Sequence, residues 1–242
     1  IIPVHWTGRI CNMKVINRIS KKYNLKLIED AAQAMGSTYY NKKAGTFGDI
    51  AAFSCHPLKN LNALGDAGFI ITNKKKLYDK IKLYRNHGLY KRDDARIFGV
   101  NSRLDSLNAT VLSYRLSKLD ELIKKRRKNI ALYRKRLSMV EGILLPQDKE
   151  YEYSSYVMFV VQCRKRDQLQ KYLLKEGIQT IVYYGNPLHK HLSSKKIKLD
   201  TGNLKNSEKI CKNVLALPHH QHLSEKQINF VCKKIINFYK NN

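Results

Sequence analysis

The sequence predicts an α/β fold, with a mostly parallel sheet covered by helices and a smaller α+β domain after it. Over the first ninety residues, short apolar runs alternate with helical patterns, which is typical of parallel sheets with helical crossovers. After Gly142 the pattern changes to a few separate strands and helices. We therefore expect a large domain over residues 1–118 and a small carboxy-terminal domain over residues 119–242.

The elements of the large domain follow from hydrophobic periodicity. Apolar side chains recur every three or four residues in a helical stripe at Met13, Ile16, Ile19 and Tyr23. Runs rich in β-branched and aromatic residues, bounded by turn residues, predict strands. We expect strands at 1–4, 25–28, 50–53 and 68–72, a hairpin over 37–47 with its turn at 41–43, helices at 13–23 and 75–85, and a polar loop at 89–99.

A long amphipathic region links the two domains. Leucines and valines recur on one helical face from Leu104 to Leu122, and the helical pattern continues to about Leu137. The basic run at 124–128 within it is expected to be a solvated face. In the small domain we expect a strand at 155–163, a helix at 167–176, a strand at 178–183, and a final helix with Ile228, Val231, Ile235 and Phe238 on one face.

The charge balance is strongly basic. Lys and Arg number 46 against 19 Asp and Glu, which gives a formal net charge of +27. An excess of this size could indicate nucleic-acid binding through phosphate contacts. The basic residues, however, are spread along the whole chain, without a basic tail or a repeated basic–aromatic module. A solvated surface explains them, and we expect no nucleic-acid partner, although a basic nucleic-acid-binding module stays open as an alternative from a different class.

The cysteines and the hydropathy indicate the compartment. The five cysteines are scattered and never form a C-x-x-C pair, so we expect small buried hydrophobes in a reducing compartment. No run of about eighteen apolar residues and no signal peptide is present. We expect a soluble cytoplasmic protein with no membrane attachment. Three neighbouring histidines, His219, His220 and His222, lack a Cys or carboxylate at ligand spacing, so we expect no metal site.

One lysine and one aspartate stand out by their places. Lys59 is the single lysine of a polar stretch, 53–68, that separates two apolar runs, and Asp30 ends another apolar run. In open α/β sheets, ligands bind beyond the carboxyl ends of the strands, so an amine and an acid could face one pocket. Taken singly, such residues are more often a solvated lysine and a helix-capping aspartate.

Together, these residues form two motifs that resemble a known family. The patterns "EDAAQA.G" at 29–36 and "FS.HP.KN....GD.G" at 53–68 resemble those of the DegT/DnrJ/EryC1/StrS family of pyridoxal-phosphate-dependent nucleotide-sugar aminotransferases. The resemblance covers nearly all 242 residues and implies the aspartate aminotransferase-like fold, known as fold type I. It also implies that the chain lacks the family's amino-terminal portion, including a turn that binds the cofactor phosphate; the first residue, Ile1, is consistent with a fragment.

The resemblance implies roles for residues around the cofactor, pyridoxal 5′-phosphate. Lys59 would form the Schiff base and then move a proton, and Asp30 would pair with the pyridine nitrogen. Gln33 would lie near the phenolic oxygen, and Ser54 would bind the phosphate. Asn101, in "VNSRLD", would reach the phosphate in the partner subunit, which implies a homodimer with shared active sites.

The resemblance also implies the reaction. His56, Tyr184 and His189 match positions near the substrate. The implied activity is transfer of an amino group, from glutamate, to a keto-deoxysugar carried on a nucleotide, in the synthesis of surface polysaccharide or glycoside sugars. A dehydratase or a regulatory homologue of the same family is the alternative. Dehydratases of this group replace the Schiff-base lysine by histidine, so Lys59 argues against that reading.

Overall fold

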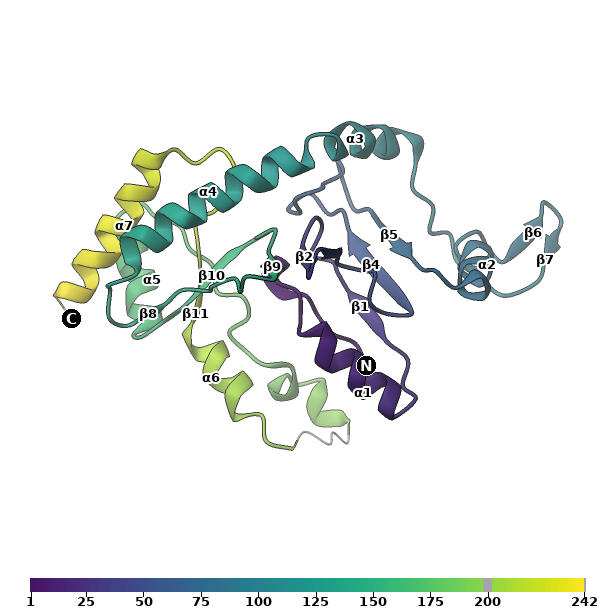
Figure 1. Cartoon of the computed structure of the whole chain (residues 1–242), viewed down its shortest axis with the longest axis horizontal. Helices are drawn as coiled ribbons and strands as arrows, with labels where there is room; N and C mark the ends of the chain where they lie inside the picture. Colours follow the sequence, from purple (N-terminus) through teal and green to yellow (C-terminus); the bar gives the residue numbers. More distant parts are fainter. Residues whose placement is uncertain (198–201, 242) are drawn as a thin grey trace. The chain divides into compact units, whose positions relative to one another are not determined.

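The computed structural model describes residues 1–197 and 202–241. The chain forms two compact units (Figure 1). The first contains residues 1–124 and 148–157, and the second contains residues 125–147 and the chain from Met158 onward. The segment 148–157 belongs with the first unit because its strand β9 (Glu152–Tyr153) pairs with β2 (Thr38–Tyr39) there.

The first unit is built on a three-stranded sheet in which β4 (Ile50–Ser54) lies between β1 (Ile28–Asp30) and β5 (Gly68–Ile71), as Figure 1 shows. β1 and β4 are parallel, with Asp30 opposite Ala52, and β5 is antiparallel to β4. The start of the chain runs parallel to β1 through the bridge between Val4 and Asp30. The carboxyl ends of β1 and β4 therefore lie at the same edge of the sheet.

The strand expected at 25–28 forms later in the chain, because β1 begins only at Ile28. Asn24 has a positive φ of 49°, and the Ser20 hydroxyl donates a 2.7 Å hydrogen bond to the carbonyl of Leu25. These contacts close a turn after α1 (Met13–Lys22) and delay the strand.

The hairpin of β2 and β3 (Lys42–Lys43) turns one residue earlier than expected. Its two central residues, Tyr40 and Asn41, both have positive φ, at 48° and 60°. Two consecutive positive φ values are the mark of the tight turns whose twist matches that of paired antiparallel strands. The turn is therefore set by backbone conformation at 40–41, and the two lysines lie in the returning strand.

The expected loop at 89–99 contains a second hairpin, of β6 (Leu89–Lys91) and β7 (Asp94–Ala95), so the prediction of irregular structure there is wrong. The Arg96 guanidinium lies 3.4 Å from the centre of the Tyr90 ring, and its Nε is 3.1 Å from the Asp94 carboxylate. These contacts across the hairpin stabilise it. It follows α2 (Lys75–Tyr84), which has no buried residue.

The long amphipathic region is helical as expected and consists of two helices, α3 (Ser106–Leu116) and α4 (Leu119–Leu137). Asp105 starts α3 by accepting a 2.7 Å hydrogen bond from the N–H of Asn108. The break at residues 117–118 lets both helices contribute to one cluster. Leu112, Leu119 and Ile123 pack there against buried residues of the 53–68 stretch, which are Cys55, Leu61 and Ala63.

The second unit has an antiparallel sheet in the order β11 (Val214–Leu217), β10 (Phe159–Cys163), β8 (Ile143–Leu144). It also contains the part of α4 after residue 124, together with α5 (Arg166–Lys175), α6 (Lys205–Asn213), α7 (Glu225–Lys240) and the short 3-10 helices η2 (Leu188–Lys190) and η3 (Ser194–Lys196). The final helix is confirmed, and Ser224 begins it with a capping box. No described helix combines the length and the apolar character needed to cross a membrane.

Two strands predicted in this unit need correction. The strand expected over 178–183 does not form, since Ile181 makes only a single bridge, to Ala216 of β11. β11 is the strand that pairs with β10 along its length. The strand expected over 155–163 begins only at Phe159. Residues 155–157 belong to the first unit, where Ser155 and Val157 bond to the backbone of a turn near the start of the chain.

Candidate active site

The predicted acid and amine lie beyond one edge of the first unit's sheet. Asp30 is the last residue of β1 and Ser54 the last residue of β4, and the two strands are parallel neighbours. Lys59 follows Ser54 by five residues in the loop that leads to β5. The parallel register, rather than closeness in sequence, brings the two motifs to the same place.

The loop that carries Lys59 is held by its own backbone and by buried apolar residues. The N–H of Cys55 donates to the carbonyl of Ala67 at 2.7 Å, and the N–H of Ala63 donates to the carbonyl of Cys55 at 2.8 Å. Inside this frame a tight turn closes with the N–H of Lys59 donating to the carbonyl of His56, also at 2.8 Å. The lysine therefore stands on a fixed turn and is half-buried.

Two opposing effects act on the Lys59 amine. Burial lowers the pKa of Lys59, because the ammonium loses solvation, while the charge of Asp30 raises it. Burial is the larger effect, and the pKa of Lys59 is lowered overall. A lowered pKa increases the neutral fraction of the amine, which is the form that attacks a carbonyl.

Asp30 is fixed on both sides by the first strand-like segment of the chain. Its N–H donates to the carbonyl of Pro3 and its carbonyl accepts from the N–H of His5, both at 3.0 Å. One carboxylate oxygen, Oδ1, accepts a 3.1 Å hydrogen bond from the N–H of Ala32. The carboxylate thus has a set direction and keeps accepting capacity for a cationic or N–H donor.

Gln33 and Ser54 each accept a hydrogen bond from the backbone and keep a donor group for another partner. The Gln33 Oε1 accepts a 2.6 Å hydrogen bond from the N–H of Thr7, so the NH₂ group of that amide is left to donate. The Ser54 Oγ accepts from the N–H of His56 at 3.2 Å, which leaves the hydroxyl proton to donate. An amine, a carboxylate, an amide donor and a hydroxyl donor are the groups that an aromatic aldehyde with a ring nitrogen and a phosphate requires.

Comparison with known proteins assigns the chain. The sequence profile of the DegT/DnrJ/EryC1/StrS aminotransferase family matches residues 1–236. The chain belongs to this family. The resemblance noted in the sequence and the α/β fold class are therefore confirmed.

Two relatives and one solved structure illustrate the similarity. The chain is 38% identical over 242 residues to the "Pleiotropic regulatory protein" of Geobacillus stearothermophilus, covering 99% of this chain and 65% of that protein. It is 39% identical over 235 residues to the dTDP-3-amino-3,6-dideoxy-alpha-D-galactopyranose transaminase of Aneurinibacillus thermoaerophilus, covering 97% of this chain and 64% of that protein. The crystal structure of S. venezuelae DesV in complex with a ketimine intermediate superposes with a TM-score of 0.94 at 32% identity, covering 99% of this chain and 64% of that one. The chain thus spans less than two thirds of the length of these relatives.

The other residues that the family motifs point to belong to several parts of the chain. Asn101 is exposed, in the segment between β7 and α3, where its Oδ1 accepts a 3.2 Å hydrogen bond from Arg103. His56 lies in the lysine loop and is partly exposed. Tyr184 and His189 belong to the second unit, where the His189 Nε2 is 3.0 Å from the Glu208 carboxylate. Glu208 also pairs with Lys190 at 2.9 Å, so its carboxylate holds two basic groups.

Glu29, the residue before Asp30, forms a buried ion pair with His5 that no pattern in the sequence indicates. His5 and Glu29 are fully buried, with the His5 Nε2 2.9 Å from Glu29. Burial lowers the pKa of His5, but the side chains of Cys11 and Glu29 outweigh it and raise that pKa to about 9. Glu29 accepts three further hydrogen bonds of 2.6–2.8 Å from the N–H groups of Gly45, Phe47 and Gly48. Burial raises the pKa of Glu29. The hydrogen bond with His5 and the three backbone hydrogen bonds outweigh burial, so the pKa of Glu29 is lowered overall.

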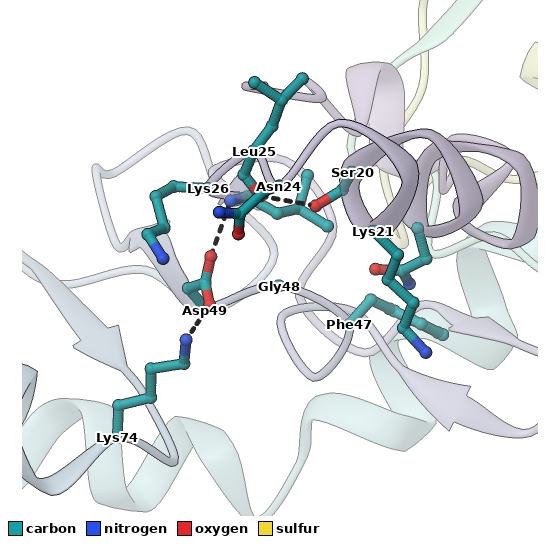
Figure 2. Close-up of a pocket in the computed structure, with 11 residues that line it drawn as sticks. Ser20, Lys21, Asn24, Leu25, Lys26, Phe47, Gly48, Asp49 and Lys74 are labelled. Atoms are coloured by element: carbon teal, nitrogen blue, oxygen red, sulfur yellow. Dashed lines mark hydrogen bonds and ion pairs between the residues drawn. The ribbon is translucent and has the colours of Figure 1, made fainter.

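A cavity of about 440 Å³ lies at the opposite end of the same strands (Figure 2). Leu27 and Asp49, which precede β1 and β4, line it together with Lys21, Lys26 and Lys74. Asp49 accepts from the N–H of Leu27 at 2.8 Å and pairs with Lys74. Its carboxylate therefore joins the starts of two strands, and the cavity lacks the buried amine that marks the carboxyl end.

The three carboxy-terminal histidines form no metal centre in the described chain. The rings of His220 and His222 lie 6.2 Å apart. Across residues 1–197 and 202–241, no three His, Cys, Asp or Glu side chains are grouped in a way that could hold a metal ion.

Proposed function

We propose that the protein containing this chain is a pyridoxal-phosphate-dependent aminotransferase that delivers an amino group to a keto-deoxysugar carried on a nucleotide. The observation that carries the proposal is the half-buried Lys59, with its lowered pKa, on the same edge of the sheet as Asp30. Family membership and the transaminase among the relatives support the reaction class and the substrate class.

The residues fit the cofactor by the chemistry of their groups. Lys59 offers the amine for the aldehyde, and Asp30 offers a carboxylate for the ring nitrogen. Gln33 offers its NH₂ group to the phenolic oxygen, and Ser54 offers its hydroxyl to the phosphate. When bound, pyridoxal phosphate supplies the electron sink that lets a proton leave the carbon next to the amine.

The chain's own residues then do the remaining work. Asp30 keeps a proton on the ring nitrogen, since an ion pair there favours the charged form. Lys59, once released, would move a proton between the α-carbon of the amino donor and the C4′ carbon of the cofactor, and its lowered pKa increases the fraction of neutral amine that can accept that proton. We propose glutamate as the donor, with His56, Tyr184 and His189 near the substrate.

We also propose a homodimer in which Asn101 serves the neighbouring subunit's site. Asn101 is exposed, and the helix after it, α3, leaves large apolar side chains uncovered: Leu107 is 67% exposed and Leu116 is 55% exposed. Such side chains are typical of a surface that another protein covers. For the compartment we propose the cytoplasm, since all five cysteines are free thiols.

Cofactor trapping tests the central assignment. The full-length protein, incubated with pyridoxal phosphate, should develop an absorbance band that borohydride removes, and peptide mapping should find the cofactor on Lys59. Lys26→Ala, at the amino end of β1, is the matched control and should label like the parent. Label on another lysine, or none in the parent, would contradict the proposal.

Mixing inactive variants tests the shared site. Lys59→Ala and Asn101→Ala should each be inactive, but subunit exchange should create hybrids in which one site carries both lesions and the other carries neither. Up to about half of the sites in such a hybrid should regain activity, because the two-fold interface separates the lesions. No recovery after proven exchange would place Asn101 outside the neighbour's site.

The name of one relative favours a second candidate. The Geobacillus protein is called a pleiotropic regulatory protein, so a regulatory homologue without transaminase activity is the alternative. Cofactor trapped on Lys59 together with no amino transfer from glutamate to any nucleotide-linked keto sugar would favour it.

A further inference from the structure

The residue after the proposed Schiff-base lysine is an unusually buried amide. Asn60 is only 5% exposed, although it lies in a loop. Its Nδ2 donates a 3.0 Å hydrogen bond to the carbonyl of Ser155, a residue 95 positions away in the sequence. Its Oδ1 is buried and has no hydrogen-bond partner within the described residues. Burying a polar atom without a hydrogen-bond partner destabilises the folded state. The burial of Asn60 therefore needs an explanation, and its hydrogen bond to Ser155 is the contact that can give one.

Ser155 is part of a small buried polar cluster, which also contains Gly8 and Ser37. The N–H of Ser155 lies 3.2 Å from the carbonyl of Gly8 and 3.1 Å from the Ser37 Oγ. The Ser37 hydroxyl is 2.6 Å from the same Gly8 carbonyl and 2.9 Å from the Ser155 Oγ. Ser37 and Ser155 are fully buried, so these bonds are shielded from water and hold their geometry.

Gly8 allows this close packing. Its φ is +91°, and a Cβ there would lie 2.7 Å from the Ser155 Oγ and 2.8 Å from the N–H nitrogen of Tyr156. The preceding residue, Thr7, accepts a 3.1 Å hydrogen bond from the N–H of Val157. Two segments far apart in sequence are therefore locked backbone to backbone at residues 7–8 and 155–157.

The same turn holds the second residue proposed to contact the cofactor. The N–H of Thr7 donates the 2.6 Å hydrogen bond to the Gln33 Oε1 that fixes the direction of the Gln33 amide. A continuous set of hydrogen bonds thus runs from Asn60 through Ser155 and the Thr7–Gly8 backbone to Gln33. One end lies beside Lys59 and the other carries the NH₂ group proposed for the phenolic oxygen.

We infer that Asn60 is a positioning residue, which sets the place of Lys59 relative to Gln33 through the buried cluster of Ser155, Ser37 and Gly8. The inference rests on the proposed function, because it concerns two groups that would hold one cofactor. Loss of the Asn60 amide leaves the Ser155 carbonyl buried without that donor and frees the lysine loop from the turn that orients Gln33. Both contacts to the cofactor then weaken together.

Cofactor affinity distinguishes positioning from a general contribution to stability. Asn60→Ala should raise the Kd for pyridoxal phosphate, measured by absorbance titration of the full-length protein, by roughly fivefold to tenfold, the effect of about one buried hydrogen bond. Asn62→Ala is the matched control. Asn62 lies in the same loop, and its amide donates to the carbonyl of Pro57 within that loop at 2.9 Å. Asn62→Ala should lower the unfolding temperature of the cofactor-free protein, since the Asn62 Oδ1 also accepts a 2.6 Å hydrogen bond from the Arg115 guanidinium, and it should leave the Kd unchanged.

A double-mutant cycle tests the connection itself. If Asn60 acts through the turn that holds Gln33, the two substitutions should not act independently. The Kd of the double variant Asn60→Ala, Gln33→Ala should then be lower, by about threefold or more, than the Kd obtained by multiplying the two single effects. When Asn62→Ala is combined with Gln33→Ala, the fold-change in Kd should equal the product of the two single fold-changes. Simple multiplication for Asn60, or an equal rise in Kd with Asn62→Ala, would overturn the inference.

A second variant covers the case in which Asn60→Ala does not fold. Ser37→Ala weakens the cluster from its far side and leaves Asn60 intact, so the Kd should rise in the same way, by about twofold or more. An unchanged Kd in that variant would contradict the inference. The parent protein distinguishes failure of the proposed function from failure of this inference. The absence of a borohydride-sensitive band in the parent would refute the proposed function. A normal band in the parent, with the Kd unchanged in the Asn60 and Ser37 variants, would refute this inference alone.

Discussion

The two ends of strands β1 and β4 each hold a lysine and an aspartate, with opposite outcomes. At the amino end, Asp49 pairs with Lys74, whose side chain is 51% exposed, and also binds the N–H of Leu27. The pKa of Asp49 is lowered by Lys74 first and by that N–H second. At the carboxyl end, burial dominates and lowers the pKa of Lys59 despite the charge of Asp30. The same residue types thus form an ion pair with a half-exposed lysine at the amino end, whereas at the carboxyl end burial outweighs the attraction and lowers the pKa of the amine.

Exchanging each carboxylate for an amide should separate these roles most clearly. Asp30→Asn is expected to lower kcat for amino transfer by roughly 10²–10³, because the ring nitrogen loses its stabilising charge, while KM for glutamate changes little. Asp49→Asn should leave kcat unchanged. Steady-state kinetics of both variants make the comparison, and equal turnover in Asp30→Asn and the parent would count against the ion pair with the ring.

The buried His5–Glu29 pair gives a large effect on stability. Glu29→Gln removes the charge partner of a fully buried histidine, and breaking a buried pair from one side typically costs about 3–5 kcal/mol of unfolding free energy. Denaturant unfolding of the cofactor-free protein measures it. A loss as small as that of an exposed pair would show that the pair is not closed to water.

The same pair predicts a dependence on pH. The pKa of His5 is raised to about 9 in the folded protein, so its contribution is complete below the ordinary value of 6.5 and is lost as the pH rises through about 9. The pKa of Glu29 is lowered, so its contribution is present above 4.5 and is lost as the pH falls below that value. The stability difference between the parent and His5→Gln should therefore shrink from pH 6.5 to pH 9.5. A difference that is constant over this range would contradict the assignment.

The smallest effect is expected at the partly exposed pair of Lys74 and Asp49. Lys74→Ala should lower the unfolding free energy by about 0–1 kcal/mol, and the loss should fall further at high salt, since exposed ion pairs contribute little and are screened. Denaturation at two salt concentrations tests this. A salt-independent loss of several kcal/mol would mean that this end of the sheet is as protected as the other.

Hydrophobic periodicity predicted most of the helices and strands, and the two family motifs predicted the candidate site residues. The family and the α/β class are confirmed, and Asp30, Ser54 and Lys59 do lie at one edge because β1 and β4 are parallel neighbours. Contacts set by distant segments were out of reach. Asn60 meets Ser155 across 95 residues and His5 meets Glu29 across 24, and no periodicity marks such pairs. The segment 89–95 looks like an ordinary polar loop in the sequence. Its hairpin is stabilised by the contact of Arg96 with the Tyr90 ring, which the sequence pattern does not indicate.

The return of residues 148–157 to the first unit means that neither unit is one continuous piece of chain. The polypeptide passes from one unit to the other three times, after residues 124, 147 and 157. A gene cut after residue 124 would express a first unit without β9, so β2 would have a bare edge on one side and Asn60 would lack its acceptor. Separating the units as independent polypeptides would require grafting residues 148–157 back onto the first piece.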